Sequence, residues 1–440
     1  MRAFLLAVAF VALPAAAQDL RQVYGDAKGY DAQYAAARHA LQAGLEKLPQ
    51  GRALILPTLN FSGSANSNRI DSYSRNSVNP PGLREPHSYG YSISFSQPIY
   101  RPQNLLQYDQ AEFQVKQAEA VFGQSAQDLI VRSAQAYFDV LAAQDTLALV
   151  QAQKTAIGEQ LAQAKRNFEV GTATITDTHE AQARFDLSSA QEIAAQSDLE
   201  TKRRALQQIT GKEYTVLTPL RPQVRLSPPN PANMQSWVDI AEKQSFPVRI
   251  QESSTEIAGL EAKRAAAAHR PTLDLVGSYG TTSQTGSTLI PASGSSLVTS
   301  GTVGLQLGIP LYAGGALNSR EREAAALYEK SKQDLESARR TTALTARQTY
   351  LSVTNGIAQI GALEQALVSS QSALDSNKLG YEVGVRINID VLNAQQQLFS
   401  TRRDLAVARY NTITNHLRLK AAAGSLREED LEEVNRALAP

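Results

Sequence analysis

The sequence predicts an α+β membrane protein in which one structural plan occurs twice. Three observations predict it: very long helical patterns without proline, short strands that alternate apolar with small polar residues, and short segments that recur in the same order. The recurring segments are LPTLNFSGSAN (56–66) with RPTLDLVGSYG (270–280), SQPIY (96–100) with GIPLY (308–312), and FEVGTATITD (168–177) with YEVGVRINID (381–390). Because all three pairs keep an offset of about 212–214 residues, they indicate an internal duplication rather than chance similarity.

The chain begins with the pattern of a secretory signal peptide. The basic Arg2 precedes an apolar run that ends at Leu13, and the small alanines 15–17 follow. This order predicts a signal peptide over residues 1–17, with cleavage after Ala17. A membrane-anchoring helix is the alternative, but the apolar run is too short for a helix that spans the bilayer.

The composition excludes several classes of function. The chain has no cysteine, which excludes disulfides, thiol chemistry and a lipid on an N-terminal cysteine. Its formal net charge is +1, and it has no basic stripe of the kind that binds nucleic acid. The histidines, at 39, 87, 179, 269 and 416, lack metal-ligand spacing, and no phosphate-binding glycine loop or nucleophile elbow occurs. With only two methionines and no cysteine, the chain also has no path of soft ligands for copper. These absences together predict no catalytic residue, no metal site and no cofactor.

The duplication divides the mature chain into a first repeat over 18–230 and a second over 231–440. Each repeat is expected to contain a helical segment, a β-hairpin, a long helix, the recurring turn, a second helix and a final segment. In the first repeat these are expected at about 19–49, 53–100, 104–166, 168–177, 177–209 and 210–230. In the second repeat they are expected at about 232–268, 270–312, 317–380, 381–390, 390–423 and 424–440.

The two long helical segments are rich in alanine, glutamine, leucine and glutamate, which are good helix formers. At 1.5 Å per residue, a helix of roughly 60 residues forms a rod of about 90 Å, which is far longer than a usual globular helix. Two shorter helices laid end to end would match that length. An ordinary coiled coil would explain these helices, but it would not explain the strands.

Alternation in the predicted strands indicates a membrane-spanning sheet. In SYGYSISFSQ (88–97), the aromatic and aliphatic residues share one face, and serine and glycine share the other. The same alternation occurs in LNFSGSAN (59–66) and TVGLQLGIP (302–310), and in TLDLVGSY (272–279) except at Val276. A half-buried sheet of a soluble protein would look similar. A small polar face in all four strands and a length near 10 residues favour a transmembrane barrel with a water-filled lumen.

Four strands cannot close such a barrel alone, because the smallest known barrels have about 8 strands. Two chains would give 8 strands with an interior filled by side chains. Three chains would give 12 strands and leave an aqueous bore, and the internal repeat would then give the helices quasi-six-fold symmetry. We therefore favour a homotrimer.

These features together resemble one known family. The signal peptide, the two repeats, the turn YEVGVRINIDVLNAQQQL and the C-terminal AAAGSLREEDLEEVN are similar to the TolC family of outer-membrane channel proteins, over essentially the whole mature chain. The resemblance implies a homotrimer with a 12-stranded β-barrel in the outer membrane. It also implies a 12-helix α-barrel through the periplasm, surrounded by an equatorial belt to which residues 210–230 and 424–440 would contribute.

The resemblance also implies a function. Channels of this family are exit ducts for tripartite efflux pumps or for type I protein secretion, and the sequence does not separate the two. The implied partners are two further copies of the chain, outer-membrane lipid, a periplasmic adaptor, and an inner-membrane transporter of the ABC, RND or MFS type. The alternatives are a periplasmic coiled-coil scaffold without a pore, and a general porin without adaptor-dependent gating.

The family places the recurring turns at a periplasmic tip that closes like an iris. By position in the motif, the resemblance assigns the gate to Thr176 and Asp177 from the first turn and to Tyr381 and Arg386 from the second. An Arg386–Asp177 contact would be a charge-assisted link with specific geometry. Breaking such links would let the inner helices swing outward.

Two further sets of residues follow from the resemblance. Asp390 matches one of the acidic rings that the family carries above the iris, whereas Asn393 departs from the acid expected at the second ring. The turn residues expected to form the adaptor-docking surface are Val170, Gly171, Val383 and Gly384.

The aspartates and glycines of the turns also have structural interpretations. Asp177 precedes Thr178-His179-Glu180 with the spacing of a capping box, and Asp390 also lies at a helix start, so both could be caps. Capping and a ring position can coexist for Asp390, whereas Asp177 is favoured as a gate residue. Gly171 and Gly384 are expected to have positive φ angles, which glycine adopts without strain.

Overall fold

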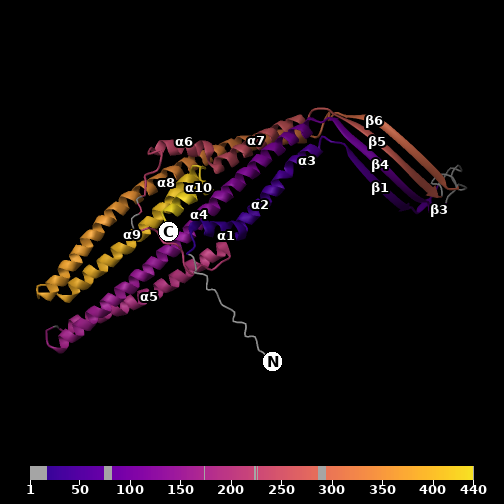
Figure 1. Ribbon diagram of the computed structural model, residues 1–440. Helices are drawn as coiled ribbons and strands as arrows, with labels where there is room; N and C mark the ends of the chain where they lie inside the picture. The colour runs from indigo at the N-terminus through magenta and orange to yellow at the C-terminus, as the bar shows by residue number, and fades with distance from the viewer. Residues whose placement is uncertain are drawn as a thin grey trace, which may run out of the picture. The chain divides into compact units, whose positions relative to one another are not determined.

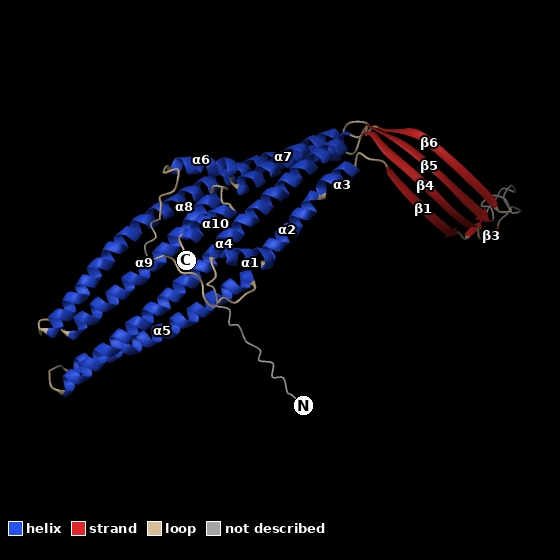
Figure 2. Cartoon of the chain, viewed as in Figure 1, coloured by secondary structure: helices blue, strands red, loops and turns tan. Residues whose placement is uncertain are grey.

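The computed structural model describes residues 17–73, 82–172, 174–221, 224, 226–285 and 294–439. The predicted signal peptide lies outside the described residues except for residue 17. Within the described residues the chain is mostly helical, with one four-stranded sheet and a short two-stranded ribbon (Figures 1 and 2). No helix in this part of the chain is long and apolar enough to cross a membrane.

The elements occur in an order that is similar in the two halves of the chain. The first half contains α1 (Leu20–Tyr30), α2 (Ala32–Leu45), α3 (Lys47–Ala53), β1 (Thr58–Ser67), β2 (Ile70–Ser72), β3 (Gly82–Arg84), β4 (His87–Tyr100), α4 (Pro102–Glu169) and α5 (Ile175–Thr210). The second half contains α6 (Met234–Gln244), α7 (Phe246–Ala267), β5 (Thr272–Thr285), β6 (Ser296–Gly308), α8 (Ala316–Glu382), α9 (Asn388–Ala422) and α10 (Glu428–Arg436).

Packing divides the chain into two compact units that each combine segments from both halves. The helical unit consists of the chain up to Ala40 with Ala120–Arg249 and Ser337–Pro440. The sheet unit consists of Leu41–Glu119 and Ile250–Glu336. The helices α4 and α8, of 68 and 67 residues, each contribute to both units.

The sheet unit contains the four strands that the alternation predicts. They are all antiparallel and have the order β1-β4-β5-β6, so the central β4–β5 pair joins the two halves of the chain. Small hydroxyl side chains meet across neighbouring strands: the Ser62 and Ser92 oxygens are 2.8 Å apart, as are those of Ser278 and Thr302. Apolar side chains are exposed, and that of Val303 is 84% accessible. The predicted alternation of four strands is therefore confirmed.

The linkers of the two hairpins, at 67–87 and 284–300, are long and rich in Ser, Asn, Gly and Pro, a composition that predicts surface loops. In the first linker, β2 and β3 instead pair as a short antiparallel ribbon. In the second, β5 and β6 extend to Thr285 and from Ser296. Residues 74–81 and 286–293 lie outside the described residues.

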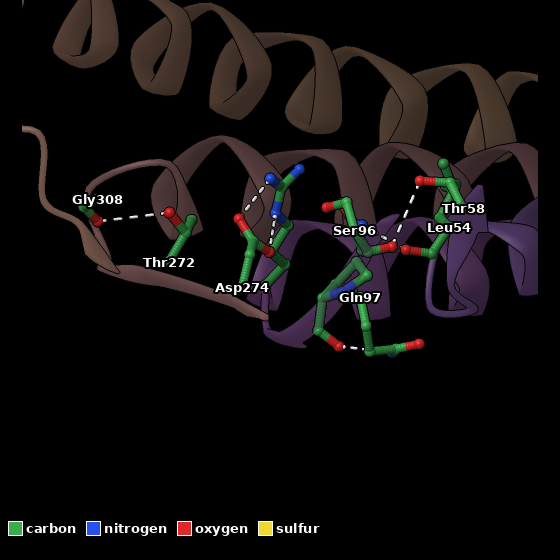
Figure 3. A network of polar contacts seen from close by, with 10 residues as sticks. Leu54, Thr58, Ser96, Gln97, Thr272, Asp274 and Gly308 are labelled. Atoms are coloured by element: carbon green, nitrogen blue, oxygen red, sulfur yellow. Dashed lines mark hydrogen bonds and ion pairs between the residues drawn. The ribbon is translucent and has the colours of Figure 1, made fainter. Parts of the chain in front are cut away.

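An ion pair between an exposed arginine and a buried aspartate marks the place where β4 ends and α4 begins. The Arg101 guanidinium donates two hydrogen bonds, of 2.7 and 2.6 Å, to the carboxylate of Asp274 on β5 (Figure 3). The Asp274 side chain is only 7% exposed, so this bidentate pair satisfies a carboxylate that would otherwise be costly to bury. The strand register shifts between Pro98 and Tyr100, where the proline ring leaves no N–H for the ladder.

Polar contacts also tie the other strand ends in the same region. The Gln97 amide donates to the carbonyl oxygens of Ile55 and Pro98, at 3.0 and 2.8 Å. Figure 3 shows Thr58 bonded to the Ser96 carbonyl and Thr272 bonded to that of Gly308. These bonds use backbone oxygens at the ends of the strand pairs, where ladder hydrogen bonding stops.

Two stretches expected to be single helical segments are interrupted. The stretch at about 19–49 contains α1, α2 and α3, because Asp31 ends α1 and its carboxylate accepts the backbone N–H of Tyr34. The stretch at about 232–268 is divided at Ser245 into α6 and α7. Pro247 is the second residue of α7, where a missing N–H costs nothing because the first turn has no intrahelical acceptor.

The core of the helical unit is an aromatic cluster between α4 and α9. Phe138 stacks on Tyr410 at a ring-centroid distance of 5.7 Å and meets Tyr137 edge-to-face at 5.5 Å. The Tyr410 hydroxyl donates to Asp145 at 2.6 Å, and burial raises the pKa of that carboxyl. The cluster also includes apolar residues of α1, α5 and α10, so the first and last helices pack into one core.

Arg132 is a half-buried charged residue of this unit that holds two carboxylates. Its guanidinium donates to both oxygens of Asp31, at 2.9 and 3.1 Å, and to Asp128 one helical turn away at 2.6 Å. The Asp31 side chain is 6% exposed, whereas that of Asp128 is 56% exposed. The hydrogen bonds from Arg132 lower the pKa of Asp31.

We predict that Asp31→Asn destabilises the helical unit by about 2–4 kcal/mol, because it leaves a half-buried guanidinium with one exposed partner. Asp128→Asn, the matched control, should cost less than about 1 kcal/mol. Fluorescence of Trp237, the single tryptophan, reports unfolding because this side chain is buried in the same unit. Since the pKa of folded Asp31 is lowered, its contribution is complete above the unfolded pKa, near about 4, and disappears as pH falls through the lowered value. Equal losses for the two variants would contradict the assignment.

We also predict opposite effects for two glycines of α8. A methyl group at Gly356 would overlap the buried Thr412 side chain of α9, whereas one at Gly361 would meet nothing within 4 Å. Gly356→Ala should therefore cost about 1–3 kcal/mol through overpacking. Gly361→Ala should raise stability by up to about 1 kcal/mol through helix propensity. Denaturant titration of both variants checks this, and a stable Gly356→Ala protein would show that α8 and α9 are not closely packed there.

Candidate functional site

The candidate site is formed by the two recurring turns, which join α4 to α5 and α8 to α9 within the helical unit (Figure 1). Gly171 and Gly384 have φ angles of 78° and 81°, so the prediction of positive φ is confirmed at both. Each glycine follows a helix end, where the left-handed conformation lets later N–H groups reach the last carbonyls. In the first turn Thr172 N bonds to Asn167 O at 2.8 Å, and in the second Val385 N bonds to Gly380 O at 2.9 Å.

The first turn continues into a capping box that uses Asp177. The Thr174 hydroxyl oxygen accepts the Asp177 N–H at 3.3 Å, and the Asp177 carboxylate accepts the Thr174 N–H at 3.0 Å. The sequence pattern suggested a box that starts at Asp177, and this register is wrong by one turn. The helix begins earlier because Thr174 is itself a good cap with an acid three residues on. Thr176 lies in the first turn of α5 and is exposed.

The second turn carries Tyr381, Arg386 and Asp390. The Tyr381 hydroxyl accepts a hydrogen bond from the Asn167 amide of α4 at 3.2 Å. The Arg386 guanidinium lies 3.6 Å from the Asp390 carboxylate, in the first turn of α9 where a negative charge is favourable. Among the described residues, no hydrogen bond or ion pair joins Arg386 to Asp177. That predicted link remains a prediction.

Polar bonds that the sequence did not predict join the α4–α5 pair to the α8–α9 pair. The Gln160 amide donates to Asn388 at 2.6 Å. The Arg184 guanidinium donates to Gln396 at 2.6 Å and to Asn393 at 3.0 Å. Asn393 lies at the position of the expected second acidic ring. Instead of supplying a carboxylate, it binds Arg184 of α5, the helix that follows the first turn. The only sequence signal was the three-residue spacing of Asn393 and Gln396, which places both on one face of a helix.

A small apolar cluster supports these bonds. Leu392 of α9 is buried against α4 and α5, in a cluster whose other buried members are Ile157, Leu161, Ala164 and Ala181. The alanines let the helices approach closely. The cluster is much smaller than the aromatic core, so polar bonds carry a larger share of the contact near the turns.

The outer surface of the turns is apolar. Val170 is 74% exposed and Val383 is 64% exposed, next to the two positive-φ glycines. Val385 and Ile387 are exposed as well. Neighbouring exposed apolar side chains on short turns are typical of a surface that contacts another protein.

The described residues contain no group of three or more His, Asp or Glu side chains that could hold a metal ion. The charged groups of the turns instead form ion pairs and caps. This arrangement can hold helices together and release them, because each bond exchanges readily with water.

Comparison with known proteins identifies the family. The model of the outer membrane efflux protein family matches residues 23–212 and 237–425. The outer membrane protein TolC of Vibrio cholerae is 33% identical over 422 residues, which cover 96% of this chain and 94% of that protein. The alkaline protease secretion protein AprF of Pseudomonas aeruginosa is 32% identical over 409 residues, covering 92% of this chain and 84% of that one.

Solved structures agree on the fold. The outer membrane protein VceC of Vibrio cholerae superposes with a TM-score of 0.76 at 18% identity, covering 92% of this chain and 96% of that one. Fold, family match and relatives point the same way, to a channel rather than an enzyme. The chain belongs to the outer membrane efflux protein family, and is a TolC-type exit channel of the outer membrane with a large periplasmic part.

Proposed function

We propose that the chain is the trimeric exit duct of a tripartite efflux pump or a type I secretion system. It would pass substrates from an inner-membrane transporter and a periplasmic adaptor to the exterior, through a tunnel with a gate at the periplasmic tip. The observation that carries the proposal is the four-stranded sheet with two edges that the described chain leaves unpaired, β1 and β6. Free edges with exposed apolar side chains require further strands.

Three copies meet this requirement. They supply 12 strands, enough to close a barrel around an aqueous bore. Their long helices would continue it as a 12-helix tunnel. The two separate matches to the family model, over 23–212 and 237–425, support an internal two-fold repeat with the predicted division into 18–230 and 231–440. The equatorial belt would be built from 210–230 and 424–440.

The gate is assigned to Thr176, Asp177, Tyr381 and Arg386. Arg386 is 60% exposed, and its contact with Asp390 is an exposed pair that contributes little. Both bonds from Thr174 go to the same carboxylate oxygen of Asp177, so the other oxygen can accept a donor from a neighbouring copy. Arg386 can therefore exchange Asp390 for Asp177 of the next chain. Asp390 would form the acidic ring above this closure.

The docking surface for the adaptor is assigned to Val170, Gly171, Val383 and Gly384. The exposed valines supply apolar area, and the positive-φ glycines present backbone without side chains beside them. Efflux and secretion are both compatible with this surface, as are ABC, RND and MFS transporters. Relatives are named for efflux and for protease secretion alike.

We predict that the purified wild-type protein has a small single-channel conductance in a planar bilayer. The double variant Tyr381→Phe with Arg386→Ser should raise it, because losing a charge-assisted bond shifts a closed–open equilibrium by about tenfold or more. Arg403→Ser is the matched control, since Arg403 is exposed on α9, the helix that follows the second turn, and pairs with its neighbour Asp404.

The outcomes separate the competing functions. A wild-type conductance that is already large and unchanged in the double variant would favour a general porin without gating. A folded protein without conductance in any variant would favour the coiled-coil scaffold. An equal rise in the Arg403→Ser control would remove Tyr381 and Arg386 from the gate.

A further inference from the structure

Arg184 is held at the contact between α5 and α9 by two neutral side chains. Its guanidinium donates to the amide oxygens of Asn393 and Gln396, at 3.0 and 2.6 Å. Both acceptors are exposed and lie one turn apart on one face of α9. Two bonds from a planar guanidinium to two fixed acceptors define where the charge lies.

The charge of Arg184 is not compensated by a carboxylate. Within the described residues it forms no ion pair, whereas Arg386 faces Asp390 and Lys154 faces Glu192 at 2.8 Å. An amide oxygen accepts a hydrogen bond without cancelling the charge.

Asn393, which binds Arg184, lies one turn after Asp390, the only carboxylate in the first turn of α9. Asp390 there is opposed by Arg386, and Asn393 in the next turn carries Arg184 instead of a charge of its own. In the proposed assembly of three chains, each of these positions would become a ring. One ring would pair its charges, and the next would carry three guanidinium groups without an ion-pair partner among the described residues.

We propose that Arg184 is a selectivity-determining residue of the duct, and that the ring at Asn393 favours small anionic solutes. The proposal rests on the proposed trimeric tunnel. A purely structural role, in which Arg184 only fastens α5 to α9, is the competing explanation. The Arg184→Lys variant separates the selectivity role from the structural role. Lysine keeps the positive charge, but it cannot form the same pair of hydrogen bonds from one planar group to Asn393 and Gln396.

The test is the reversal potential of the channel in a planar bilayer with a KCl gradient. A unit charge roughly 7 Å from a permeating ion changes the local ion concentration about threefold in water, and the ring has three such charges. Arg184→Gln should therefore raise the potassium-to-chloride permeability ratio by at least about threefold. Arg184→Lys should keep the wild-type ratio.

A second variant keeps the test decisive if Arg184→Gln folds poorly. Asn393→Asp retains Arg184 and gives it a carboxylate partner, so it should shift the ratio in the same direction. Trp237 fluorescence verifies folding of every variant. A lysine variant that behaves like Arg184→Gln, or ratios that are equal throughout, would overturn the role of Arg184 while the duct stands. A folded wild-type protein that never conducts would overturn the duct and this inference with it.

Discussion

Backbone hydrogen bonding at the edges of the sheet is the constraint on which the rest of the molecule depends. Among the described residues, β1 pairs only with β4 and β6 only with β5, so two rows of N–H and C=O groups face outward. Apolar side chains such as Phe61 and Leu305 are exposed on the same strands. Water can satisfy the backbone groups but not the apolar faces, and a membrane can do the reverse. In the assembly that we propose, closure with further copies would satisfy both, and it would bring the helices of those copies together.

The helices of the helical unit are held together more strongly at the aromatic core than near the turns. Around Phe138 and Tyr410 the helices share a large apolar core, and the half-buried Arg132 adds an ion pair to the buried Asp31. Near the turns, contact between the helix pairs depends on Leu392 and a few amide and guanidinium bonds. Burial stabilises in proportion to apolar area, so the turns are held far less firmly than the core. Helix ends can then separate while the core stays intact, which a gate at this end requires.

Sequence periodicity was sufficient for the strands, the long helices and the positive-φ glycines, because each depends on residues close together in the chain. The partners of individual side chains were harder to predict from the sequence. The cap register at Asp177 was missed because Thr174 competes for the same role only once the helix is extended by a turn. Asp31, which interrupts its helix, also pairs with Arg132 about a hundred residues away, a contact that no local pattern contains. The Arg386–Asp177 link, if it joins neighbouring chains, depends on geometry that one chain does not hold.

Asn393 couples two properties that are usually separate. A carboxylate at this position would form an ion pair with Arg184, which would strengthen the bond between α5 and α9 and cancel the positive charge at once. An amide does neither. Its oxygen accepts a hydrogen bond of 3.0 Å from the guanidinium, and the positive charge keeps no ion-pair partner within the described part of the chain. The contact is then easier to break than an ion pair, and in the proposed trimer the ring would stay cationic. In the tunnel that we propose, one side-chain atom at Asn393, an amide nitrogen in place of a carboxylate oxygen, would therefore set both the strength of the helix contact and the charge of the wall.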